Sequence, residues 1–159
     1  MKKLILIILF AALLFYSCGA GDVFKKNILN SKSYEIPKDK IWSLALTNMV
    51  KKWFVVKSQN DTLYMVQYDY REITVDDMYK YTTTDGGDYV AARYNVFIEI
   101  EEDGNNTLLT IHTNYEGLWK EYDPIWGTVS TGFQKLYSNG RFEKEFFDEL
   151  EKEIAMKKM

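Results

Sequence analysis

The segment 89–115 constrains the fold more than any other part of the chain, because its apolar residues alternate with polar ones. In residues 89–101 every second position carries the side chain expected to face a core: Val90, Ala92, Tyr94, Val96, Ile98 and Ile100. A spacing of two is typical of a β-strand with one buried face. Asp103-Gly104 then supplies a strong hairpin signal, and alternation resumes in residues 107–115. A long antiparallel hairpin is therefore predicted.

Two segments instead repeat their apolar residues every three or four positions, as amphipathic helices do. The first is 38–54, which follows Pro37 and carries an apolar stripe: Ile41, Trp42, Ala45, Leu46, Met49, Val50 and Trp53. The second follows Gly140 and carries another: Phe142, Phe146, Leu150 and Ile154. Each segment is predicted to be a helix with its stripe facing the core.

The remaining segments complete an α+β fold. Residues 33–36 indicate a short strand, and 54–57 with 62–70 indicate a hairpin. Residues 71–88 fit a short helix after Thr74, a strand or a loop, while the glycine- and proline-interrupted segment 116–137 favours a turn of helix and a crossing loop. We expect a two-layer sandwich, in which helices pack on one face of an antiparallel meander sheet.

The N-terminal leader indicates export. Lys2 and Lys3 precede thirteen apolar residues, 4–16. A helix of that length spans about 20 Å, short of the ~30 Å core of a bilayer, so it suits a signal peptide better than a permanent span. The predicted organisation is a signal peptide over 1–17, a tether over 18–30 and a single domain over 31–159.

Cys18 is the only cysteine and lies between two small residues, Ser17 and Gly19, with Phe15 three positions before it. This pattern resembles the bacterial lipobox. The resemblance implies a diacylglyceryl group on the Cys18 thiol, cleavage before Cys18 and acylation of the new amino group. The alternatives are an ordinary signal peptide cut after Cys18 or Gly19, and an uncut membrane anchor. An exported chain with one free thiol invites intermolecular pairing, and thioether formation would remove that thiol.

Composition excludes several classes of function. Loss of Lys2 and Lys3 with the leader takes the net charge from −3 to −5, and no Lys/Arg run exceeds two residues, so no nucleic-acid partner is expected. The sole histidine, His112, lies on a predicted strand without a matched set of ligands. We therefore predict no enzyme activity, catalytic residue, metal or cofactor, and a membrane partner reached through acyl chains on Cys18.

Three stretches of the mature chain resemble small envelope lipoproteins of the BamC/NlpB kind: 34–56, 95–115 and 138–154. The resemblance lies in the spacing of apolar residues. It implies a non-enzymatic role through contacts with envelope proteins, accessory to outer-membrane assembly or organisation. Gly19 after the acylated cysteine implies an outer-membrane location facing the periplasm.

A contact surface is predicted from an aromatic group in the interrupted segment: Trp119, Tyr122 and Trp126. Exposed aromatic side chains ringed by polar ones are typical of protein interfaces. The alternative is that these rings fill the sheet edge against the last helix. A second possible function is a carrier of a small apolar ligand, whose pocket would be lined by core residues: Trp42, Met49, Tyr94 and Phe146.

Overall fold

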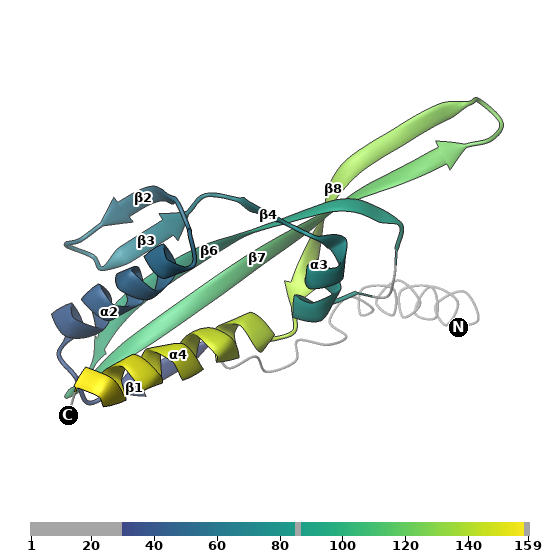
Figure 1. Ribbon diagram of the computed structural model, residues 1–159. Helices are drawn as coiled ribbons and strands as arrows, with labels where there is room; N and C mark the ends of the chain where they lie inside the picture. The colour runs from purple at the N-terminus through teal and green to yellow at the C-terminus, as the bar shows by residue number, and fades with distance from the viewer. Residues whose placement is uncertain (1–29, 85–86, 158–159) are drawn as a thin grey trace, which may run out of the picture.

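The computed structural model describes residues 30–84 and 87–157 (Figure 1). The leader, Cys18 and the predicted tether before residue 30 lie outside the described residues. Described elements follow one another in this order: β1 (Ser31–Tyr34), α2 (Lys38–Lys51), β2 (Val56–Asn60), β3 (Met65–Tyr68), β4 (Arg71–Ile73), α3 (Val75–Tyr81), β5 (Thr82–Thr83), β6 (Tyr89–Asp103), β7 (Asn106–Asp123), β8 (Thr128–Ser138) and α4 (Arg141–Lys157). The strand pairings are all antiparallel, so the predicted α+β class is confirmed.

The β6–β7 hairpin is the centre of the sheet, as the alternating segment predicted. Its pairing runs from Tyr89 opposite Trp119 to Asp103 opposite Asn106. Gly104, with φ +63°, makes the turn in a conformation that glycine adopts without strain. The outer edge of β6 pairs with β3 and β4, and that of β7 pairs with β1 and β8. The hairpin therefore organises most of the other strands.

One hydrophobic core joins this hairpin to the helices. Alternate residues of the two strands enter it: Tyr94, Val96, Ile98, Ile100, Leu109, Ile111 and Tyr115. Helices α2 and α4 add further side chains: Ile41, Leu44, Met49, Phe146 and Leu150. Val90 was predicted to join them but is exposed, because the register shifts between Tyr89 and Ala91 and turns its side chain outward.

Helix α2 ends three residues earlier than its apolar stripe predicted. The N–H of Phe54 donates to the carbonyl of Met49 and that of Trp53 to the carbonyl of Val50, which together close the helix as a Schellman motif. Beyond that closure the helical periodicity no longer applies. Trp53 is consequently exposed rather than buried, and Val50, in the last turn of α2, is exposed as well, which corrects their predicted place in the core.

The segment that the sequence left open, 71–88, contains a short helix. The Thr74 hydroxyl accepts a hydrogen bond from the Asp77 N–H at 3.0 Å and so caps α3. Met78, on the inner side of α3, is buried in the core. Of the three readings open for this segment, the helix after Thr74 is the one found.

The prediction of a helical turn and a crossing loop over 116–137 is wrong. Both halves of this segment are strand, in β7 and β8. The glycines make room for rings instead of breaking the strands: a Cβ on Gly117 would lie 2.5 Å from the Tyr89 ring, and one on Gly132 would lie 3.2 Å from the Trp119 ring. Only Gly127, at φ +61°, belongs to the turn.

Candidate interaction surface

The β7–β8 hairpin continues past the end of β6 and projects from the rest of the molecule (Figure 1). Tyr89 opposite Trp119 is the last pairing between β6 and β7, whereas β7 and β8 stay paired as far as Asp123 opposite Thr128. We call residues 120–131 the arm. Its two strands have each other as their only sheet neighbours within the described part of the chain.

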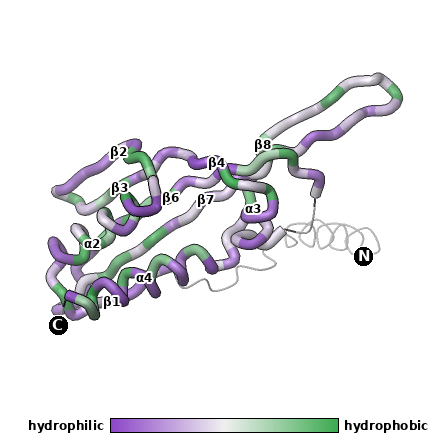
Figure 2. Tube along the Cα trace, viewed as in Figure 1, coloured by the Kyte–Doolittle hydropathy of each residue, from purple (hydrophilic) through white to green (hydrophobic). Residues whose placement is uncertain are grey.

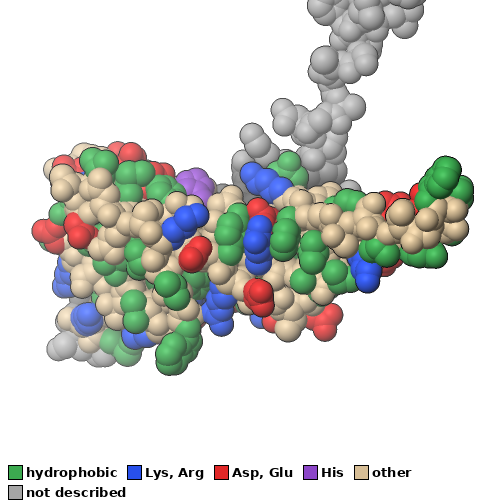
Figure 3. All heavy atoms as spheres, turned by 90° about the horizontal axis from the view of Figure 1, so that it is seen from above, with side chains coloured by type: hydrophobic (Ala, Val, Ile, Leu, Met, Phe, Trp, Pro, Cys, Tyr) green, Lys and Arg blue, Asp and Glu red, His purple; other side chains and the backbone are tan. Residues whose placement is uncertain are grey.

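The end of the arm presents two large apolar side chains. The Asp123 carboxylate accepts hydrogen bonds from the N–H groups of Ile125, at 2.8 Å, and Trp126, at 3.2 Å, which holds the turn. Ile125 is 82% exposed and Trp126 is 78% exposed. Figure 3 shows hydrophobic side chains gathered at this end. We call these two residues the tip.

The three aromatic residues predicted to form a contact surface do not lie together. Trp119 is half-buried over Gly132. Tyr122 is three residues further along the strand, so it points to the opposite face, where it is exposed and lies opposite Val129. Trp126 is at the tip. Since Tyr122 and Trp126 are largely exposed, they do not fill the sheet edge against α4.

Sequence reasoning missed a second apolar feature, on β8. Val129, Phe133 and Tyr137 are four residues apart, so they share one face of the strand, and they are 52%, 47% and 68% exposed. We call these three the edge stripe. Figure 2 shows hydrophobic stretches on the arm apart from those of the core strands. Their alternation is present in the sequence, but Gly132 within it indicated a loop.

A charged and aromatic cluster holds the base of the arm. The Arg93 guanidinium lies 3.8 Å from the Phe133 ring centroid and 4.4 Å from that of Tyr70. Its Nε donates to Glu116 at 2.7 Å, and the Tyr70 hydroxyl donates to the same carboxylate at 2.8 Å. Burial alone would raise the pKa of Glu116, but these two hydrogen bonds and the Arg93 charge bring it below its ordinary value. The cluster fixes the inner side of the Phe133 ring.

His112, the sole histidine, is exposed on the same face of the sheet. Its Nε2 lies 3.5 Å from the Glu99 carboxylate, and its ring stacks on Phe97 with centroids 6.1 Å apart. Among residues 30–84 and 87–157, no group of three or more His, Cys, Asp or Glu side chains is arranged to hold a metal ion. Within the described residues, His112 therefore forms an exposed contact with the Glu99 carboxylate.

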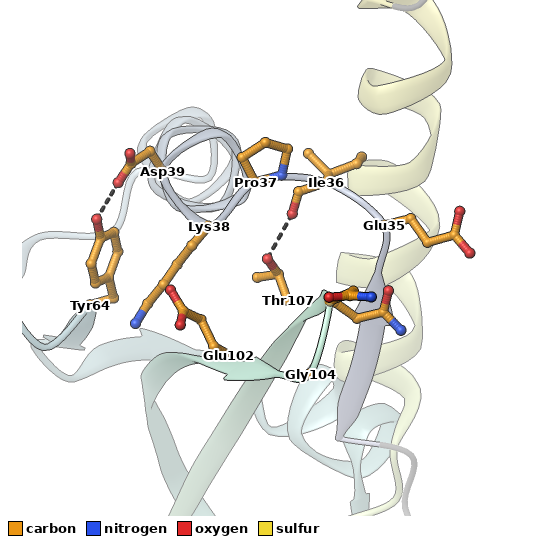
Figure 4. Close-up of a pocket in the computed structure, with 11 residues that line it drawn as sticks. Glu35, Ile36, Pro37, Lys38, Asp39, Tyr64, Glu102, Gly104 and Thr107 are labelled. Carbon is orange, nitrogen blue, oxygen red and sulfur yellow. Dashed lines mark hydrogen bonds between the residues drawn. The ribbon is translucent and has the colours of Figure 1, made fainter.

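A pocket of about 500 Å³ lies where the loop before α2 meets the β6–β7 turn (Figure 4). Tyr64 donates to the Asp39 carboxylate on one side, and Thr107 donates to the Ile36 carbonyl at 2.7 Å on the other. The residues predicted to line a carrier's pocket are not among those lining this one; all four are buried in the core: Trp42, Met49, Tyr94 and Phe146.

Trp53 is the most exposed of the large apolar side chains, at 84%, and its backbone is left-handed, with φ 62°. Glycine is the usual residue at this position after a helix, since a Cβ there costs about 1–2 kcal/mol. Trp53→Gly is therefore expected to raise the free energy of unfolding by about 1 kcal/mol, as measured by urea denaturation. An unchanged or lower value would contradict the strain inferred at this residue.

Comparison with models of known protein families finds no match to this chain, and comparison with curated proteins finds none either. The resemblance to BamC/NlpB-like lipoproteins accordingly stays a prediction drawn from apolar spacing.

Proposed function

We propose that this protein is a lipid-anchored envelope lipoprotein that faces the periplasm and acts without catalysis, through contacts of its folded domain. Acyl chains on Cys18 would hold it at the membrane, most simply the outer membrane, since Gly19 follows the cysteine. Two or three chains suffice for stable anchoring, because each buried methylene contributes about 0.8 kcal/mol.

The observation that carries this proposal is the place of the sole cysteine, directly after a leader of signal-peptide length and between two small residues. The first described strand, β1, begins at Ser31, and we propose that residues 18–30 form a tether between the lipid and the domain. Among the described residues, no helix has the length and apolar character needed to cross a bilayer.

The arm supports the second half of the proposal, action through contacts. Its exposed tip and edge stripe concentrate apolar side chains on a projecting element, which suits an interface better than a ligand cavity. We further propose that the helices form one layer and the sheet the other, as the sequence predicted. The sheet face that carries Phe133 and His112 would then be open to partners.

Cys18→Ser is expected to abolish acylation, because the hydroxyl cannot form the thioether. The wild-type chain purified from membranes should lack residues 1–17 and carry added acyl mass in intact mass spectrometry. The variant should keep its leader, and Ser17→Ala, which preserves a small side chain, should be processed normally. A wild-type chain that starts at residue 18 or beyond without acyl mass would refute the proposal.

A further inference from the structure

Over most of its length, one edge of β8 has no neighbouring strand among the described residues. From Thr128 to Lys135, β7 is the only described strand paired with β8, and β5 reaches the other edge at Tyr137. Exposed edges of this length are normally protected by charges, prolines or bulges. Here Lys135 is the single charged residue, proline is absent, and the β7 pairing has no register shift. The strand is therefore open to pairing.

We propose that this edge pairs antiparallel with the β8 edge of a second copy of the chain, with Thr131 at the two-fold axis. In this register Val129 of each copy lies opposite Phe133 of the other, and Thr131 lies opposite itself. Residues directly opposite in an antiparallel pair point to the same face, so the edge stripes of the two copies merge on one surface. Val129 of one copy meets Phe133 of the other, and Phe133 of the first meets Val129 of the second, which is the reciprocity that a two-fold interface requires.

Neighbouring registers fit less well. Moving the axis to Gly132 places Lys135 opposite Val129 and loses the Val129–Phe133 pairs. Moving it to Phe133 places Val129 opposite Tyr137, whose edge is already occupied by β5. With the axis at Thr131, residues 128–134 of both copies form a seam of about 24 Å that contains no charge.

The same arrangement explains why the apolar side chains of the tip are exposed on the single chain. Trp126 and Leu136 are each five residues from Thr131, so Trp126 of one copy lies opposite Leu136 of the other, beside the exposed Tyr137. The tip and the exposed parts of the edge stripe would then lie in one contact with the second copy. A strand from an unrelated protein would not provide this reciprocity, which favours a second copy as the occupant.

Thr131→Cys tests the register in the full chain, in membranes of producing cells. Opposite residues have Cβ atoms about 5 Å apart, close to the span of a disulfide, so mild oxidation should convert most of the protein into a disulfide dimer. Ser58→Cys, on the exposed edge strand β2, is the matched control and should stay monomeric. Differently tagged Val129→Cys and Phe133→Cys chains should crosslink to each other and not to themselves. Failure of Thr131→Cys to crosslink, or equal crosslinking of Ser58→Cys, would overturn the inference.

Thr131→Lys provides an independent test, because it places two ammonium groups opposite each other at the axis. The full wild-type chain in detergent should sediment as a dimer, and this variant should dissociate at least ten times more readily. Ser58→Lys should remain dimeric, and circular dichroism should show all three folded. A wild-type monomer at tens of micromolar, or a variant that dimerises normally, would contradict the proposal. Dimers of the wild-type chain through a bare Cys18 would refute the lipid anchor instead, since acylation consumes that thiol.

Discussion

Raising the pH above 10 is expected to unfold this protein within one to two pH units. Four tyrosines with buried side chains are responsible: Tyr34, Tyr68, Tyr94 and Tyr115. Burial raises the pKa of each above its ordinary value of 10, to about 12 for Tyr94 and further for the others. Such a shift is a stability effect, because the unfolded chain releases these protons first.

The direction in which pH changes the stability follows from the number of protons that the folded and unfolded chains bind. Below pH 10 folded and unfolded chains both keep the four protons, so their contribution to stability is complete. Between pH 10 and about 12 the unfolded chain binds fewer protons, and each tyrosine lowers the free energy of unfolding by at most about 1.4 kcal/mol per pH unit. Four together give a slope of roughly 5 kcal/mol per unit, comparable to the whole stability of a small domain.

Tyr68→Phe isolates one of these contributions. The Tyr68 hydroxyl is buried without a hydrogen-bond partner among the described residues, while its ring packs edge-on against Phe54 at 5.6 Å. The variant keeps the ring contact, so it should be as stable as wild type or slightly more so at pH 7. It should also lose about a quarter of the alkaline slope in urea titrations from pH 7 to 12. A Tyr68→Phe curve identical to wild type would contradict the explanation.

Phe146→Ala is expected to lower the free energy of unfolding by about 3–5 kcal/mol, because it removes a fully buried ring from the shared core of α4 and the sheet. Trp126→Ala removes a larger ring, yet it should change that free energy by no more than about 0.5 kcal/mol. The difference arises because Trp126, at the tip, contributes almost nothing to the core. Urea denaturation of the two variants beside wild type measures both effects.

The small effect expected of Trp126→Ala also bears on the role of this residue. A large apolar side chain that does not stabilise the fold exposes surface at a cost in solubility, so an interface is the physical explanation that we favour. If Trp126→Ala were as destabilising as Phe146→Ala at concentrations where both chains are monomeric, the arm would have to pack against the body of the molecule. The inferred dimer seam would then be unavailable.

The central hairpin was predictable because its signals are local. The strand predicted over 89–101 and the Asp103-Gly104 turn depend only on neighbours in the sequence, and both were confirmed. The alternation itself fails at Val90, where the register shifts. The strands of segment 116–137 were not predictable in the same way, because its Gly117 and Gly132 are strand breakers by propensity. They are tolerated here because rings from other strands, Tyr89 and Trp119, cover them.

The candidate surface could be predicted only in part, again because it depends on contacts between distant parts of the chain. Trp126 and Tyr122 were singled out from composition, but which side chains share a face depends on β8, which the interrupted segment concealed. Exposure of the edge stripe depends further on which strands of the described chain flank β8, a non-local fact that the spacing of residues does not encode. Trp53 was assigned to the core because helical periodicity does not show where a helix closes.

The attachment of β1 determines how the domain responds to force. β1 pairs with only four residues of β7, and the Asn30 carbonyl before it accepts one more hydrogen bond, from the Ile111 N–H at 2.8 Å. Any pull transmitted through the chain before Asn30 loads this short ladder before it reaches the fourteen register pairs between β6 and β7. Under tension β1 should peel away first and lengthen the link to the N-terminal end, while the central hairpin and its arm remain intact.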